Sequence, residues 1–293
     1  MSNAAKGALW MIAAAAALTA MAVCIRYLPA YSVLLMIFLR NVINLVLMAP
    51  SMIRQGKSMI VTQRLGTHAL RNLFLYSGNV AWFYGVTLIA LADVASLQFT
   101  SPLFTAIIAA AFLGEKIGGH RMVAILVGFA GALIIIRPGM GLMHIAILFP
   151  FGTAFAHAFY QILTRKLSGA DSSMTTLAYT AVVGTVLSSL AAPFYWTAPD
   201  LEGWVLMALI GILAGLGHYF LIRAYEYAEA PVVAPFFYTH FLWTTLFGVT
   251  IFGDLPDMWT FIGAGVIFMS GLYIHHRENV RRVEVSAPKD PSI

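Results

Sequence analysis

The chain has 293 residues, of which 60% are hydrophobic and only 10% are charged, and its mean hydropathy is +0.85. Soluble domains carry about a quarter charged residues, so this composition excludes an ordinary soluble enzyme, a nucleic-acid-binding protein and a disordered chain. The apolar residues form continuous runs without period-2 alternation, which also argues against an outer-membrane barrel. We therefore predict an all-α polytopic membrane protein.

A helix needs about 20 apolar residues to cross the hydrocarbon core of a bilayer. Ten such runs follow one another, with approximate limits 8–25, 31–50, 71–91, 94–113, 120–136, 142–163, 174–195, 203–222, 231–252 and 257–275. Pro102, Pro150 and Pro235 lie within these runs and are expected to kink the helices. The short connections leave no room for a soluble domain.

Lys and Arg are distributed unequally between the two sides that ten spans define. Fourteen are assigned to the side of the N-terminus, including Arg64 and Arg71 near the start of the third span, whereas only Arg26 and Arg137 lie on the opposite side. Because Lys and Arg collect in cytoplasmic loops, we expect both termini in the cytoplasm. The expected location is the cell inner (plasma) membrane.

The two halves of the chain resemble each other at an offset of 139 residues. The matches are Val94-Ala95 with Val233-Ala234, Thr100 with Thr239, and Gly114-Glu115 with Gly253-Asp254. Since each half holds five spans, an odd number, the second half must be inverted in the membrane. Inverted repeats are typical of secondary transporters, whose substrate site lies near the midplane. We predict repeats at 1–139 and 140–277, followed by a polar cytoplasmic tail at 278–293.

Several short motifs resemble the drug/metabolite transporter superfamily with two EamA-type halves. They are Phe38-Leu39-Arg40, Ala92-Asp93-Val94-Ala95 leading to Pro102, Leu113-Gly114-Glu115-Lys116, and Ala230-Pro231 leading to Phe252-Gly253-Asp254. The resemblance covers nearly the whole chain and implies a transporter rather than an enzyme. Within the superfamily the chain is most similar to exporters of amino acids, including aromatic ones. It departs from the usual pattern at His240-Phe241, where the family often has an acidic residue and proline.

Arg40 is the only full charge that we place inside a predicted span. A charge at membrane depth is costly and usually faces the bundle interior. Arg40 could anchor a substrate carboxylate, but arginine here resembles a general family feature, so we favour a structural role. All twelve acidic residues fall at span ends, in connections or in the tail. A strongly cationic substrate, and proton coupling through a carboxylate, are therefore disfavoured.

Polar and aromatic residues of five spans are expected to line one central cavity. These candidate substrate-binding residues are Asn79, Trp82, Gln98, Ser101, His157, Tyr160, Gln161, His218, Tyr219, Tyr238, His240 and Trp243. Rings can stack on a flat substrate while amides and imidazoles orient its polar end. For each residue, an interhelical hydrogen bond or helix packing is the alternative. No metal or cofactor is expected, since Cys24 is the single cysteine.

We predict a carrier that exports small metabolites, foremost aromatic and other neutral amino acids, by alternating access. A carrier for nucleosides, flavins or other planar metabolites is the alternative, because stacking rings would serve these equally. A lipid-modifying enzyme would need a catalytic cluster that the sequence lacks, and a channel would usually show a charged or glycine-rich filter. The expected partners are a small-molecule substrate and the lipid bilayer, with no nucleic acid and a monomer as the working unit.

Overall fold

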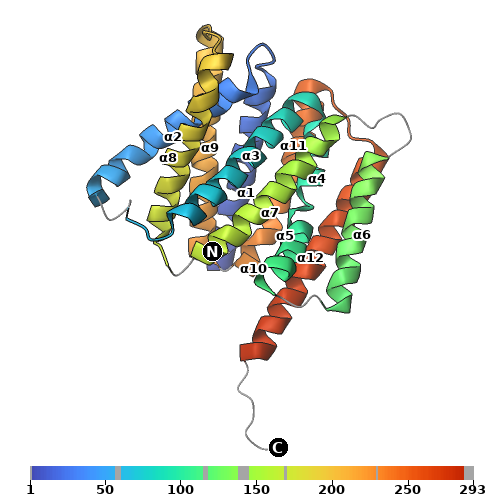
Figure 1. Cartoon of the computed structure of the whole chain (residues 1–293). Coiled ribbons are helices and arrows are strands. Elements are labelled where there is room, and N and C mark those ends of the chain that lie inside the picture. The colour runs from blue at the N-terminus through green and yellow to red at the C-terminus, as the bar shows by residue number, and fades with distance from the viewer. Residues whose placement is uncertain are drawn as a thin grey trace, which may run out of the picture.

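The computed structural model describes residues 2–56, 61–114, 118–137, 145–167, 170–228 and 230–286. Within these ranges every element is helical. The elements are α1 Asn3–Arg26, α2 Val33–Gln55, α3 Leu65–Leu88, α4 Leu91–Gln98, α5 Ser101–Leu113, α6 Gly119–Ile136, η2 Ile145–Ile147, α7 Leu148–Leu167, α8 Ser173–Ala191, η3 Ala192–Tyr195, α9 Leu201–Tyr227, α10 Ala230–Val233, η4 Ala234–Tyr238, α11 Thr239–Phe252 and α12 Met258–Ser286. The helices pack into one bundle, and α12 extends beyond its lower end (Figure 1).

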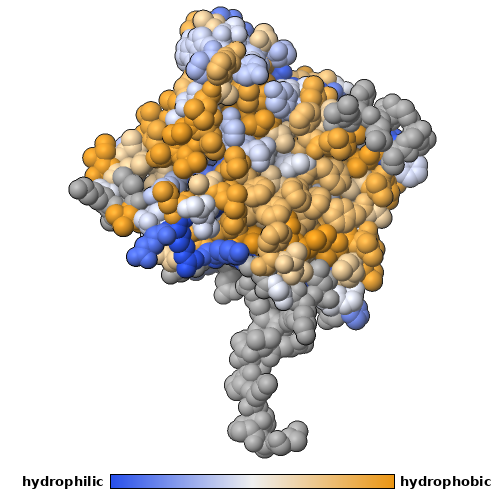
Figure 2. All heavy atoms as spheres, viewed as in Figure 1, coloured by the Kyte–Doolittle hydropathy of each residue, from blue (hydrophilic) through white to orange (hydrophobic). Residues whose placement is uncertain are grey.

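Helical residues lie on each of the ten predicted runs. In the part of the chain that the structure describes, six helical segments are long and apolar enough to cross a membrane, with α4 and α5 counted as one. Polar residues within α3 and α7 lower the hydropathy of those helices, so the count of ten spans remains a prediction. The face in Figure 2 is largely apolar, and hydrophilic residues gather at the top and lower left.

The fourth predicted run is interrupted rather than kinked. α4 ends at Gln98 and α5 begins at Ser101, with Pro102 in the first turn of the new helix. Proline has no backbone N–H to donate, so it is tolerated in a first turn and disrupts a helix interior. Pro150 likewise lies in the first turn of α7, and Pro235 lies in the short helix η4.

The helix boundaries of the second half recur at the offset predicted from the sequence. The matched ends are Leu88 with Tyr227, and the matched starts are Leu91 with Ala230 and Gly119 with Met258. Gly114 and Gly253, which terminate α5 and α11, both adopt a left-handed conformation, with φ of 69° and 70°. Glycine enters this region without the penalty of a Cβ atom. These recurrences support the internal repeat, which stays a proposal together with its inversion.

Contacts between the halves follow the same offset. A Cβ atom added to Gly78 of α3 would lie 3.0 Å from Cδ2 of His157 on α7, and one added to Gly217 of α9 would lie 2.7 Å from Cδ2 of Leu18 on α1. The offset relates Gly78 to Gly217 and Leu18 to His157. Each half therefore places a glycine of its third long helix against the first helix of the other half, and this close packing needs a small residue.

A hydrophobic cluster holds α1, α2, α3 and α9 together. Its fully buried members include Ile25, Leu35, Phe83 and Ile210, and Trp82 belongs to the same cluster. Burying these side chains against one another fixes the relative positions of the four helices.

Candidate substrate site

Three polar side chains from three helices lie within electrostatic range of one another. They are Arg40 of α2, His157 of α7 and His218 of α9, and we call them the central cluster. Arg40 and His157 hold buried polar atoms, whereas His218 is exposed.

The central cluster has unused hydrogen-bonding capacity. Arg40 is 7% exposed, and its guanidinium carbon lies 6.0 Å from the ring centre of Phe83. Among the described residues, Nε of Arg40 and Nε2 of His157 are buried without a hydrogen-bond partner. Nδ1 of His218 donates to the Ala214 carbonyl oxygen at 2.7 Å. A ligand that supplies acceptors would satisfy the unpaired groups.

Predicted site residues of α3 lie next to this cluster. Asn79 is half-buried and directly follows Gly78, against which His157 packs. Trp82 is buried and its ring meets that of Phe83 edge-to-face at 5.7 Å. The contacts given between α3 and the central cluster are those of Phe83 with Arg40 and of Gly78 with His157, and Asn79 and Trp82 are their neighbours in the chain.

Arg71 is a buried charge that the sequence analysis missed. From the sequence we predicted that Arg71 lies at the cytoplasmic start of a span. In the structure α3 already begins at Leu65, six residues before Arg71, and the Arg71 side chain is buried at 2% exposure. Its guanidinium donates to Thr164 at 2.7 Å, Thr180 at 2.9 Å and the Tyr160 hydroxyl at 2.8 Å. We call these four residues the Arg71 network. Arg40 is therefore not the only charge inside the bundle.

The Arg71 network changes the interpretation of Tyr160. We expected this ring to contact substrate, yet its hydroxyl accepts from Arg71, whose guanidinium carbon lies 4.4 Å from the ring centre. Its ring is 6.4 Å from that of His157. Tyr160 therefore lies between the network and the central cluster.

A second polar contact lies one turn earlier on α3. Nε2 of His68 is 2.9 Å from the Asp171 carboxylate, and the His68 ring stacks on Tyr179 at 4.5 Å. The Thr62 hydroxyl donates to the same carboxylate at 2.8 Å. Hydrogen bonds from Thr62 and His68 hold the pKa of the Asp171 carboxyl below its usual range. This contact joins α3 to the start of α8.

The other predicted site residues lie in several places. Gln161 is exposed and its amide donates to Ser101 at 3.5 Å, which links α7 to α5. Gln98, at the end of α4, is half-buried. Tyr219 is 52% exposed and meets the Trp10 ring of α1 edge-on. Among the described residues, these side chains make no hydrogen bond or ring contact with the central cluster.

The candidate residues of the ninth predicted run, 231–252, form a separate group. Tyr238 packs edge-to-face between Phe99 at 4.7 Å and Phe268 at 4.3 Å. His240 is 5% exposed and stacks on Phe237. Nε1 of Trp243 is buried without a partner among the described residues. Packing accounts for Tyr238 and His240, and Trp243 retains an unused donor.

Ion pairs connect the two halves at the end of the bundle that we predict to be external. Arg26, at the end of α1, pairs with Asp254, which follows α11. Arg137, at the end of α6, pairs with Asp257, just before α12. The Thr260 hydroxyl donates to Asp93 at 2.8 Å nearby. These contacts hold first-half and second-half helices together at this end.

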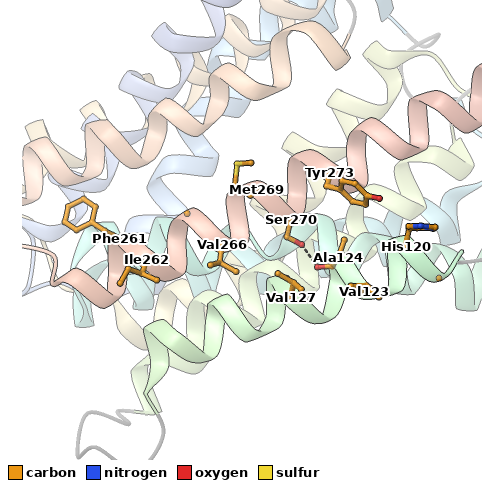
Figure 3. Close-up of a pocket in the computed structure, with 12 residues that line it drawn as sticks. His120, Val123, Ala124, Val127, Phe261, Ile262, Val266, Met269, Ser270 and Tyr273 are labelled. Carbon is orange, nitrogen blue, oxygen red and sulfur yellow. Dashed lines mark hydrogen bonds between the residues drawn. The ribbon is translucent and has the colours of Figure 1, made fainter.

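A groove of about 890 Å³ runs between α6 and α12. Val123, Val127, Ile262 and Met269 line it, while His120 lies near one end (Figure 3). The Ser270 hydroxyl donates to the Ala124 carbonyl and joins the two helices. The lining offers few groups that could recognise a polar metabolite, so the central cluster is the better candidate site.

The arrangement defines a class of protein before any relative is considered. A helical membrane bundle holds unpaired hydrogen-bonding groups and aromatic rings at its centre, and no group of three or more potential metal ligands occurs among the described residues. Ionisable groups inside a helical membrane bundle usually mark a pathway for a substrate or ion. The class that this arrangement indicates is a membrane transporter.

The chain belongs to the EamA-like transporter family, whose model matches residues 5–137 and again residues 144–274. It is therefore a membrane transporter and not an enzyme, in agreement with the sequence analysis. The two matched ranges coincide with the two halves that we propose as repeats.

The names of relatives in this family state two different substrates. An S-adenosylmethionine uptake transporter of Rickettsia bellii is 30% identical over 82% of this chain and 83% of its own. A riboflavin transporter of Vibrio cholerae is 31% identical over 92% of each chain. A solved crystal structure matches 97% of this chain and all of its own with a TM-score of 0.62 at 16% identity, which indicates a shared fold alone.

Proposed function

We propose that this protein carries a metabolite that contains a planar heterocycle, such as a flavin or an adenosyl compound, across the inner membrane. Riboflavin and S-adenosylmethionine, which name its relatives, share one feature, a flat aromatic heterocycle with a hydrogen-bonding edge. This favours the alternative substrate class of the sequence analysis over amino-acid export.

One observation carries the proposal. The buried Nε of Arg40, whose guanidinium lies over the ring of Phe83, and the buried Nε2 of His157 have no hydrogen-bond partner among the described residues. A few such polar groups inside a pocket can orient the hydrogen-bonding edge of a bound heterocycle. A buried donor without a partner costs free energy that a bound acceptor recovers.

Counterflow in liposomes tests the proposal. Purified full-length protein is reconstituted with internal unlabelled compound, and entry of the labelled compound is followed for riboflavin, S-adenosylmethionine, adenosine, phenylalanine and leucine. We expect saturable counterflow for at least one heterocyclic metabolite, and none for leucine. Counterflow of phenylalanine and leucine without any of the three heterocyclic compounds would instead favour amino-acid transport and contradict the proposal.

A further inference from the structure

Arg40 has no counter-charge in its surroundings within the part of the chain that the structure describes. The side chain is 93% buried, since it is 7% exposed, and no carboxylate of the described residues pairs with it. A buried charge left without a partner is strongly unfavourable. The face of Phe83 at 6.0 Å offers only weak compensation, about 0.5–2 kcal/mol for cation–π contacts in general.

The central cluster contains a second buried hydrogen-bonding atom without a partner. Nε2 of His157 is buried and unpaired among the described residues, and its ring is held against Gly78 of α3. Arg40, His157 and His218 act on one another electrostatically. Two buried groups on different helices, within electrostatic range of each other, are therefore left with free hydrogen-bonding positions, which a structural arginine bonded to carbonyls would not leave.

Within the described ranges, the rest of the bundle offers no carboxylate that would neutralise a cation beside Arg40. Every Asp and Glu in the described ranges lies in the first or last turn of a membrane helix, in a connection, or in the part of α12 beyond the last predicted span. Asp93 and Asp254 lie at one end, and Asp171 and Glu226 lie at the other. A net cation entering the centre would meet Arg40 without an opposing charge.

We propose that Arg40 is a substrate-binding residue that receives an electron-rich group of the substrate, a carbonyl or carboxylate, with His157 as the second contact. The site then selects neutral or anionic heterocyclic metabolites over metabolites of net positive charge. This inference rests on the proposed function and replaces the structural role that the sequence alone favoured for Arg40. Flavins satisfy it, because their ring carries two carbonyl oxygens and no charge.

A matched pair of adenosyl compounds isolates the charge. S-adenosylhomocysteine is a net-neutral zwitterion, and S-adenosylmethionine differs from it by one methyl group and one positive charge. We expect the wild-type protein, purified in detergent, to bind riboflavin and S-adenosylhomocysteine. Its affinity for S-adenosylmethionine should be lower than that for S-adenosylhomocysteine by at least about tenfold, because Arg40 repels the additional positive charge of the sulfonium. A preference for S-adenosylmethionine in the wild-type protein would overturn the proposal without any mutation.

Variants of Arg40 assign the preference to this residue. Arg40→Gln should lose at least about tenfold in affinity for S-adenosylhomocysteine and riboflavin, and should bind both adenosyl compounds alike. Arg40→Lys keeps the charge and should keep the preference at reduced affinity. Arg54→Gln removes an exposed charge from the same helix and serves as the matched control, with wild-type values expected.

The outcomes separate the two proposals. A folded Arg40→Gln protein with wild-type affinities and preference would overturn the role of Arg40 while leaving the heterocycle carrier intact. If Arg40→Gln does not fold, the role of Arg40 is decided by the preference of the wild-type protein between the two adenosyl compounds and by the preference of Arg40→Lys. If the wild-type protein binds none of the heterocycles, both proposals are wrong.

Discussion

Two arginines are buried within the bundle, and their surroundings differ. Arg71 donates to side chains of α7 and α8, whereas Nε of Arg40 has no partner in the described part of the chain. A buried guanidinium whose donors are satisfied stabilises the fold that surrounds it, while one with free donors is available to a ligand. The two residues are therefore assigned different roles.

The role of Arg71 can be measured against that of Arg64. Both residues donate from the start of α3 to the end of α7, but Arg71 is buried, whereas Arg64 is exposed and bonds to the Lys166 carbonyl at 2.7 Å. Arg71→Gln should lower the free energy of unfolding in mixed micelles by about 2–4 kcal/mol, because it removes hydrogen bonds from a buried guanidinium to Thr164, Thr180 and Tyr160 on two other helices. Arg64→Gln should change it by less than about 1 kcal/mol. Equal effects would contradict the structural role of Arg71.

Asn79 remains a predicted contact for the substrate. If its amide bonds to the bound heterocycle, Asn79→Ala should weaken binding by roughly five- to a hundred-fold, the equivalent of about 1–3 kcal/mol. Ser77→Ala is the control, because Ser77 is exposed on the same helix and its hydroxyl donates to the Phe74 carbonyl at 2.9 Å. Binding of riboflavin to purified variants distinguishes the two. Equal affinities would place Asn79 outside the site.

Small residues decide how closely the helices of the two halves approach. α6 and α12 meet through Gly131 and Gly263, where a Cβ atom on Gly263 would lie 2.6 Å from the Gly131 carbonyl oxygen. At the offset of 139 residues, Gly131 corresponds to Ser270 and Ala124 corresponds to Gly263. The contact between Gly131 and Gly263 is therefore equivalent to the neighbouring contact between Ala124 and Ser270. Equivalent contacts on either side of one point are expected where a two-fold axis passes between helices. The α6–α12 contact is thus where we place the axis of the proposed repeat.

Gly263 and its neighbour Gly265 form a matched pair for testing this contact. Gly263→Ala pushes a methyl group against backbone and should lower the free energy of unfolding by about 1–3 kcal/mol, the usual cost of overpacking. A Cβ atom on Gly265 meets nothing within 4 Å, so Gly265→Ala should leave stability unchanged or slightly raised. Thermal unfolding in detergent provides the measurement. A destabilised Gly265→Ala with a normal Gly263→Ala would refute this packing of α6 on α12.

At the scale of the whole molecule, the ion pairs at one end tie the halves together. Arg26 belongs to the first half and Asp254 to the second. Transport by alternating access requires the halves to move relative to each other. If this end opens during the cycle, the pair must separate once per turnover.

A reversible cross-link tests that separation. In a Cys24→Ala background, Arg26→Cys and Asp254→Cys are joined by a short bifunctional thiol reagent that contains a disulfide. We expect the cross-linked protein to lose counterflow and to regain it on reduction, because the halves can no longer part. Each single variant, treated with the same reagent, should keep its activity. Full counterflow with the cross-link in place would exclude opening at this end.

The orientation in the membrane is predicted from the distribution of Lys and Arg. In the same background, cysteine at Thr197, in the exposed segment before α9, should react with an impermeant thiol reagent added to intact cells. Cysteine at Gln63, exposed before α3 at the end that we predict to be cytoplasmic, should react only after permeabilisation. The reverse result would invert the predicted topology.

The sequence by itself determined the class of protein and the positions of its helices. Runs of apolar residues predict helices because a chain in lipid must satisfy its own backbone hydrogen bonds. The C-terminal ends of helices are also determined locally, since Gly114 and Gly253 end their helices by adopting a left-handed conformation that glycine enters without steric cost. The membrane class, the family and the transport function were all within reach of such local patterns, whereas the substrate class remains a proposal.

Only the tertiary structure decided which polar residues face one another. Arg71 reaches Thr164 and Thr180, which lie 93 and 109 residues away in the chain, and no periodicity encodes such a pairing. The same holds for Tyr160, whose hydroxyl is taken by Arg71, and for Arg40, whose Nε is left without a partner among the described residues. Hydropathy shows that a polar group is costly in a span, but whether that cost is met within the fold depends on the side chains that distant helices bring beside it.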